Sequence, residues 1–299
     1  MKLQVYQVDS FTKCKFSGNP AGVVPHADGL TEKQMQQIAR EFNNSETAFI
    51  FSPTATDHDV HVRFFTPGVE VPLCGHATIA AHYIRAIEKN LPTTTVIQKT
   101  GAGILPVDII KEDKDYKIWM TQSTPSFAEP FAGINRQVIV NALGLVENDL
   151  VEEAPVQFVD TGHGKVMICI KSRKQLNELN PDFTRLAEFS TVTGYKGYFV
   201  FTLDSDDDNV LTHGRMFAPA IGINEDPVTG NAHGPLGAYL VKHNLVDHDG
   251  SLFSFTGIQG EAMGRPGTVD VEVQINNGES ERVKIGGYAV VVFQTTIEI

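Results

Sequence analysis

The chain has 299 residues, of which 41% are hydrophobic and 20% are charged, and its formal net charge is −12. That length fits about two domains of the usual ~100–200 residues, each with a well-formed core. The acidic balance argues against a nucleic-acid partner, because proteins that bind phosphate backbones normally present a basic face.

No targeting segment, membrane partner or disulfide framework is expected. The first eight residues alternate like a strand and lack the apolar core of a signal peptide, and the apolar run 288–293 is too short to cross a bilayer. The three cysteines, Cys14, Cys74 and Cys169, are widely spaced and contain no CxxC pair. We therefore expect a cytoplasmic protein.

The first half predicts strands interleaved with two helices. Thr31 is a plausible N-cap for a helix in which Met35, Ile38 and Phe42 share one face. In residues 77–89 the polar side chains form only a narrow stripe, which is typical of a central helix wrapped by a sheet. The expected strands lie at 3–8, 20–24, 46–51 and 60–65, the expected hairpin at 104–120, and a Pro- and Gly-containing linker at 121–133.

A short stretch occurs twice. Residues 70–77 (Glu-Val-Pro-Leu-Cys-Gly-His-Ala) are echoed by 225–232 (Glu-Asp-Pro-Val-Thr-Gly-Asn-Ala). Further pairs follow in the same order: 8–10 with 159–161, 38–42 with 185–189, 46–51 with 196–201, and 63–67 with 215–219. We infer a duplicated domain with pseudo-twofold symmetry. Its copies would span 1–121, to which a closing strand at 288–299 could return, and 134–287.

Each copy of the repeated stretch leads into an apolar segment of helical character. The first turn of a helix has unpaired N–H groups at the positive end of the macrodipole, which suits an anion. Two such helix N-termini suggest two domains that close on one negatively charged ligand. The copies differ at matched positions: Glu46 against Lys196, Val71 against Asp226, Cys74 against Thr229, and His76 against Asn231.

Glu46 is the strongest candidate for proton chemistry. It heads an apolar strand, where partial burial would raise the pKa of its carboxyl towards the working pH, although a cap or surface role is also open. Asp226 could simply complement a helix dipole. His76 could orient substrate, pass a proton or donate to backbone. Cys74 has Thr229 and no second thiol at the matched position, which favours a small buried thiol over a paired-cysteine base.

The residues predict no cofactor or metal. Walker A, GxGxxG and HExxH motifs are absent. His58 and His61 would point to opposite faces of a strand, and the acidic loop 205–209 lacks the ligand spacing of a calcium loop, so it is expected to be a solvated turn.

The chain resembles the PhzF-like isomerase family of phenazine biosynthesis, which shares the fold of diaminopimelate epimerase. The resemblance rests on the motifs at 18–24, 44–49, 65–67, 74–78 and 225–232. It implies an α+β (α/β) fold of two similar domains, each a curled, mostly antiparallel sheet around a central helix, with the active site between them. It also implies no metal, no organic cofactor and frequent homodimers.

The resemblance further implies residue roles. Glu46 would be the proton-shuttling acid/base, with His76 and Asp226 lining the same pocket. Substrate would be held by the backbone around Gly75, His76, Gly230 and Asn231, and by Asn19 and Thr229. This chain has Asn231 where the family commonly has serine, which affects substrate identity. Thr229 replaces the second catalytic cysteine of diaminopimelate epimerase.

The expected function is therefore a cofactor-independent isomerase that moves a proton between carbons of a small carboxylate-bearing metabolite through Glu46. One alternative is an amino-acid racemase or epimerase that uses Cys74. Another is a non-catalytic protein that binds an acidic metabolite. A role in phenazine synthesis does not follow, because family membership transfers fold and chemistry better than pathway.

Overall fold

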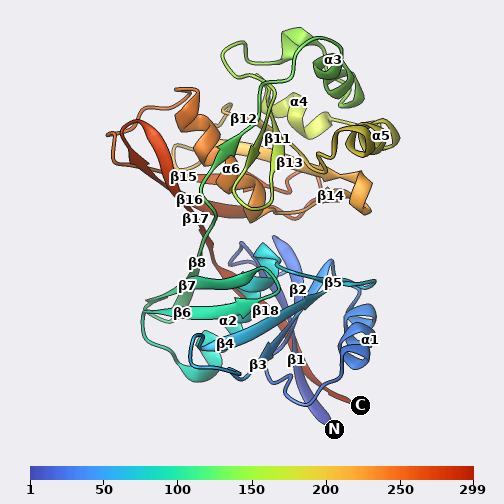
Figure 1. Cartoon of the computed structure of the whole chain (residues 1–299), viewed down its shortest axis with the longest axis vertical. Coiled ribbons are helices and arrows are strands. Elements are labelled where there is room, and N and C mark those ends of the chain that lie inside the picture. Colours follow the sequence, from blue (N-terminus) through green and yellow to red (C-terminus); the bar gives the residue numbers. More distant parts are fainter. The chain divides into compact units, whose positions relative to one another are not determined.

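The structure is a computed structural model that describes residues 1–299 and divides into two compact units (Figure 1). Unit 1 comprises Met1–Thr121 and Gly286–Ile299, and unit 2 comprises Gln122–Ile285. No helix in either unit is both long enough and apolar enough to traverse a bilayer.

Unit 1 is a sheet curled around helix α2. Its helices are α1 (Glu32–Phe42) and α2 (Gly75–Lys89). Its strands are β1 (Lys2–Ser10), β2 (Asn19–Val24), β3 (Glu46–Phe51), β4 (Val60–Phe65), β5 (Glu70–Val71), β6 (Thr94–Thr100), β7 (Gly103–Glu112), β8 (Asp115–Thr121) and β18 (Ala289–Glu298). Helix α2 contacts β1, β2, β3, β7, β8 and β18, so strands surround most of its circumference, as its narrow polar stripe predicts (Figure 1).

Local sequence signals explain the helix boundaries and the hairpin of unit 1. Thr31 and Gln34 form a capping box that starts α1, and Asn43 ends that helix in the left-handed conformation. Met35 and Ile38 of α1 are buried against β1, β2 and β3. The predicted hairpin is confirmed as β7 and β8, which pair from Glu112↔Asp115 at the turn.

Unit 2 repeats this plan with additional helices. Its helices are α3 (Gly133–Ala142), α4 (Arg173–Glu178), α5 (Phe183–Thr193) and α6 (Gly230–Lys242), with 3-10 turns η1 (Glu147–Asp149) and η2 (Pro219–Ile221). Its strands are β9 (Ser126–Phe127), β10 (Gln157–Asp160), β11 (Lys165–Cys169), β12 (Tyr198–Thr202), β13 (Thr212–Ala218), β14 (Ile223–Asp226), β15 (Leu252–Gln259), β16 (Gly267–Asn276) and β17 (Glu279–Gly287). Helix α6 occupies the place of α2 and contacts β10, β11, β15 and β16.

The strand pairings of the two units follow the same order. In unit 1, β2–β3 and β4–β6 are parallel, while β1–β2, β3–β4 and β6–β7 are antiparallel. In unit 2, β11–β12 and β13–β15 are parallel, while β10–β11, β12–β13 and β15–β16 are antiparallel. Both sheets are therefore mixed and mostly antiparallel, and the internal duplication inferred from sequence is visible strand by strand.

The repeated glutamate of the Glu-x-Pro stretch has a structural role in both units. Glu70 accepts two hydrogen bonds from Arg63, at 2.7 and 2.6 Å. Glu225 accepts two from Arg215, both at 2.8 Å. A bidentate arginine–carboxylate pair fixes direction as well as distance. Each pair thus ties the strand that precedes the central helix to its neighbour.

The segment match of 46–51 with 196–201 is wrong in register by one residue. Thr47 pairs with Phe65, and Tyr198 pairs with Phe217, whereas Phe65 and Phe217 are themselves equivalent. The residue equivalent to Glu46 is therefore Gly197, and not Lys196.

The ends of the two units are held by strand pairing. Strand β18 pairs antiparallel with β1 from Lys2↔Glu298 to Ser10↔Ala289. Within unit 2, β9 lies in the stretch read from sequence as a linker, and it pairs with β10 through Val159↔Phe127 and Asp160↔Ser126.

Candidate active site

Unit 1 brings Glu46, Cys74 and His76 together. Glu46 is the first residue of β3, Cys74 is the N-cap of α2, and His76 lies in the first turn of α2. The His76 Nε2 atom is 3.3 Å from Glu46 Oε2, and Cys74 Sγ is 3.5 Å from His76 Nδ1. The side chains of His76 and Glu46 are only 8% and 14% exposed. The arrangement is a shielded carboxylate in contact with an imidazole.

Neighbouring serines and β2 hold this cluster. Ser45 Oγ lies 3.2 Å from His76 Nε2, so the imidazole contacts both the first residue of β3 and the residue directly before it. Ser10 Oγ donates a hydrogen bond of 2.8 Å to the carbonyl of His76, which anchors the first turn of α2. Ser10 also pairs with Asn19, the buried first residue of β2. Asn19 therefore lies in the strand pair that supports the helix end.

Neither central helix is capped at its N-terminus by its own N-cap side chain. The side chains of Cys74 and Thr229 make no capping hydrogen bond to α2 or α6. The first-turn amides of both helices, including those of Gly75 and Gly230, thus lack the partner that a capping side chain usually supplies. Amides in this position favour an anion.

Unit 2 gathers Asp226, Thr229 and Gln259 at the start of α6. Thr229 Oγ1 donates to Asp226 Oδ2, and the Thr229 amide donates to Gln259 Oε1 at 3.0 Å. Gln259 Nε2 donates to the Asp226 carbonyl at 2.7 Å. Asp226 is buried, so this network holds its carboxylate in one place.

Asn231 is oriented by a relay of side chains. Thr161 Oγ1 donates to Gln122 Oε1 at 2.7 Å, and Gln122 Nε2 donates to Asn231 Oδ1 at 3.0 Å. A Cβ atom on Gly234 would lie 1.7 Å from Gln122 Oε1, so the glycine makes room for the relay. Because Oδ1 of Asn231 is engaged, its amide N–H₂ is the group left to donate to a ligand.

Unit 2 has a lysine where unit 1 has the glutamate. A Cβ atom on Gly197 would lie 2.4 Å from Lys165 Cδ, so the lysine stem fills the space beside this equivalent of Glu46. Burial lowers the pKa of Lys165 to about 8, against the opposing effect of the carboxylates of Asp226 and Asp160. Unit 2 thus has an amine beside the position that carries the Glu46 carboxylate in unit 1, and this amine also donates to the carbonyls of His163 and Gly164 at 2.8 and 3.3 Å.

The structure places the predicted site residues in two groups. Asn19, Glu46, Gly75 and His76 surround the start of α2, and Asp226, Thr229, Gly230 and Asn231 surround the start of α6. Sequence reasoning missed Ser45, Gln122, Lys165 and Gln259. Ser45 could have been found from its place directly before Glu46, whereas the other three contact the site across long sequence separations.

Comparison with known proteins fits this duplicated geometry. Residues 8–295 match the family model described as phenazine biosynthesis-like protein, PhzC-PhzF. The chain belongs to the PhzC-PhzF family. It is 58% identical to an uncharacterized isomerase of Clostridium acetobutylicum, over 99% of this chain and 98% of the relative. It is 50% identical to the uncharacterized isomerase YddE of Salmonella typhimurium, over 98% and 97%.

Solved structures confirm the predicted fold class for this PhzC-PhzF chain. A Bacillus anthracis phenazine biosynthesis protein of the PhzF family matches with a TM-score of 0.89 and 32% identity, over the full length of both chains. A hydroxyproline epimerase from Agrobacterium vitis, with bound trans-4-OH-L-proline, matches with a TM-score of 0.60 and 14% identity, over 99% of this chain and 92% of that one. The second likeness concerns the fold alone.

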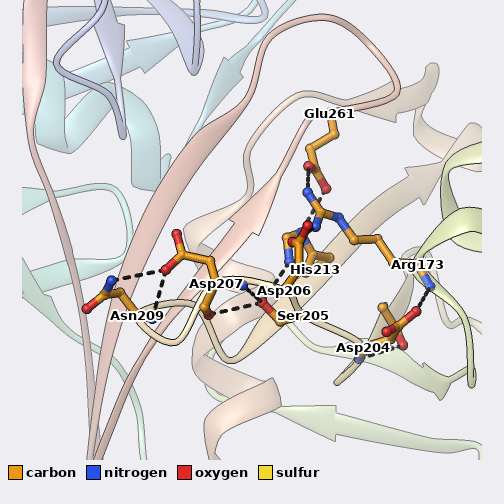
Figure 2. Close-up of polar contacts among 9 residues, drawn as sticks. Arg173, Asp204, Ser205, Asp206, Asp207, Asn209, His213 and Glu261 are labelled. Atoms are coloured by element: carbon orange, nitrogen blue, oxygen red, sulfur yellow. Dashed lines mark hydrogen bonds and ion pairs between the residues drawn. The ribbon is translucent and has the colours of Figure 1, made fainter.

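A second polar cluster of the PhzC-PhzF chain lies elsewhere in unit 2 (Figure 2). Arg173 bridges Glu261 and Asp206, and His213 contacts Glu261 Oε2 through Nδ1 at 2.8 Å and Ser205 Oγ through Nε2 at 3.2 Å. Within the acidic loop, Asp207 accepts hydrogen bonds from Asn209. The cluster is internally paired and joins this loop to α4 and β13.

From this cluster we expect a pH-dependent contribution to the free energy of unfolding. The hydrogen bond from His213, followed by that from Arg173, lowers the pKa of Glu261 from 4.5 to about 2. A lowered pKa in the folded state contributes stability above pH 4.5 that is lost as the pH falls towards 2. Glu261→Gln should therefore lower the free energy of unfolding by about 1–2 kcal/mol at neutral pH, after allowance for solvent screening. Urea titrations between pH 2 and 7 should show the two proteins converging at the acid end; a constant difference would contradict the assignment.

Proposed function

We propose that this PhzC-PhzF isomerase moves a proton between two carbons of a small carboxylate-bearing metabolite, with Glu46 as the acid/base group. The observation that carries the proposal is the contact between the shielded Glu46 carboxylate and His76 at the uncapped N-terminus of α2. A carboxylate poised beside helix amides can abstract a proton while those amides stabilise the charge that develops.

The proposed reaction balances without a second reactant. Glu46 removes a proton from a carbon next to a carboxylate or carbonyl group, and the electron pair delocalises into that group. The first-turn amides of α2 stabilise the resulting negative charge. Glu46 then returns the same proton to another carbon of the delocalised system. His76 positions the Glu46 carboxyl throughout, and no organic cofactor or metal takes part.

In this proposal Asp226, Thr229, Gly230 and Asn231 contact the same substrate. The support is the duplication, which repeats the helix N-terminus without a side-chain cap, together with the family resemblance. The N–H₂ group of Asn231 and the ammonium of Lys165 favour an acceptor or an anionic group at that end. A substrate with two acidic or oxygen-rich ends fits both groups of residues.

Gly234→Ala is predicted to weaken ligand binding with little effect on folding. The new Cβ would displace Gln122, whose flexible side-chain end can move away at low cost in stability. Asn231 would then lose its orienting partner, and affinity should fall about fivefold to tenfold, consistent with the loss of one hydrogen bond. Thermal stabilisation by a panel of carboxylate metabolites measures the effect, because a ligand that binds only the folded state raises Tm. An unchanged ligand-induced shift would contradict the relay.

The racemase alternative has one supporting observation, the proximity of Cys74 Sγ to His76 Nδ1. A two-thiol mechanism needs a second thiol, but Thr229 occupies the equivalent position in unit 2. Cys74→Ala should therefore lower turnover by less than about tenfold under our proposal, since no proton passes through the thiol. Stereochemical analysis of amino-acid substrates with this variant separates the two mechanisms. Complete inactivation with an intact fold would favour the racemase.

A further inference from the structure

We propose that Glu46, Cys74 and His76 also form a binding site for a soft divalent cation such as Zn²⁺. One ligand atom from each side chain lies within 4.8 Å of the others. The three residues all belong to unit 1, and His76 and Cys74 are fixed by the same helix end. The inhibitory consequence described below rests on the proposed function, whereas the binding itself does not.

Two of the separations between these atoms are close to the edges of a tetrahedral zinc site. Zinc bonds of about 2.0–2.2 Å to nitrogen and oxygen and about 2.3 Å to sulfur imply edges of about 3.4 Å for N···O and about 3.6 Å for S···N. The observed separations are 3.3 Å from His76 Nε2 to Glu46 Oε2 and 3.9 Å from His76 Nε2 to Cys74 Sγ. Cys74 Sγ and the Glu46 carboxylate lie within 4.8 Å of each other. Because Cys74 Sγ is nearer to Nδ1 than to Nε2, closing the site also requires the His76 imidazole to turn about its Cβ–Cγ bond until the Nε2 lone pair points at the shared ion. The Ser45 hydroxyl, 3.2 Å from the same nitrogen, can rotate away.

The donor set selects the type of ion. A thiolate, an imidazole and a carboxylate suit Zn²⁺ and Co²⁺, whereas Mg²⁺ and Ca²⁺ prefer oxygen ligands alone. Three protein ligands leave a fourth position open to water or to a carboxylate. The spacing of these residues in the sequence does not indicate a metal site, because Glu46 belongs to a separate strand and precedes Cys74 by 28 residues (74 − 46).

Occupation of this site would inhibit the proposed isomerase. A metal ion bound to Glu46 takes the lone pair that would accept the substrate proton. It also takes the His76 nitrogen that contacts Glu46. Zinc should therefore inhibit reversibly, and a chelator should restore the activity. Bound zinc should likewise slow alkylation of Cys74, because the thiolate lone pair is engaged.

The test uses the full-length protein titrated with Co²⁺ as a spectroscopic substitute for Zn²⁺, followed by displacement with Zn²⁺. We expect one equivalent to bind with thiolate-to-cobalt charge-transfer absorption. Cys74→Ser should remove that absorption and weaken binding at least tenfold, and Glu46→Gln should weaken binding but retain the absorption. Cys14→Ser is the matched control, because Cys14 is an exposed thiol of the same unit. Circular dichroism checks that each variant is folded.

The outcomes separate this inference from the proposed function. Charge-transfer absorption that persists in Cys74→Ser, disappears in Cys14→Ser, or is absent from the wild type would overturn the site. Equal competition by Mg²⁺ would do the same. If cobalt binds as expected but no isomerase activity is found, the metal site stands and only the inhibitory consequence fails. If proton exchange is found without metal binding, the proposed function stands alone.

Discussion

Glu46→Gln should lower turnover by about 10²–10⁴-fold, the range that a positioned general acid/base contributes. The amide has nearly the same shape and can still contact His76, but it cannot accept and return a proton. Substrate affinity should change far less than turnover, because the helix amides proposed to hold the carboxylate are untouched. The measurement is product formation in deuterated water with candidate carboxylates, followed by NMR. The wild type should give product with partial solvent label, since some protons exchange on Glu46 before they return.

Glu41→Gln is the matched control for this variant. Glu41 lies exposed near the end of α1, only five positions before Glu46 (46 − 41), so its substitution removes the same charge outside the cluster. Undiminished turnover in Glu46→Gln would remove Glu46 from the mechanism. Saturable binding by the wild type with no chemical change and no deuterium uptake after long incubation would instead favour a protein that senses an acidic metabolite.

The sequence predicted those parts of the fold that depend on local chemistry. The capping residues of α1, the turn between β7 and β8, and the buried character of α2 all follow from residues close together in the chain. Glu46, at the start of β3, and His76, in the first turn of α2, contact each other in the structure, and their roles in proton transfer stay predictions.

The register of the strands could not be predicted from the sequence, for a physical reason. The inner residues of β3 and all of β12 are buried. In a continuous apolar run, polar and apolar residues do not alternate, so the pattern does not fix the register of the strand. Two such runs therefore align equally well when one is shifted by a single residue. The slip hid the equivalence of Glu46 with Gly197, and with it the position of Lys165 beside that glycine.

The relay to Asn231 was hidden by distance along the chain. Gln122 and Asn231 are 109 residues apart, and the glutamine lies in a stretch that reads as a linker. Helices α3 and α4 were likewise unexpected. Helix α3 begins at Gly133, where Pro and Gly content predicted an irregular connection, and its buried residues Ile139 and Val140 join the core of unit 2. Tertiary packing outweighed the local signal.

The second large effect concerns the duplicated arginine–glutamate pairs. Glu225→Gln should lower the free energy of unfolding by about 3–5 kcal/mol, whereas Glu70→Gln should cost about 0–1 kcal/mol. The two pairs have the same bidentate geometry but different exposure. The side chains of Arg215 and Glu225 are 8% and 14% exposed, against 23% and 36% for Arg63 and Glu70. Arg63 also donates to Glu32 Oε2 at 3.1 Å, so it keeps a carboxylate partner in Glu70→Gln. Removal of one carboxylate therefore leaves a buried, unpaired charge only in unit 2.

Arg215 is also committed to the backbone, which makes relaxation costly. Its Nη1 donates to the carbonyls of Leu176 and Leu179 at 3.0 and 2.9 Å, at the end of α4. The guanidinium cannot turn towards water without breaking those bonds.

Denaturant unfolding of both variants measures the difference in stability. Peptide-level hydrogen exchange assigns that difference to a unit, which matters because a two-unit chain need not unfold in one step. Glu225 directly precedes Asp226, so Glu225→Gln should also loosen the carboxylate of Asp226, and exchange should rise first at the start of α6. Equal losses of stability in the two variants would show that exposure does not govern the strength of these pairs.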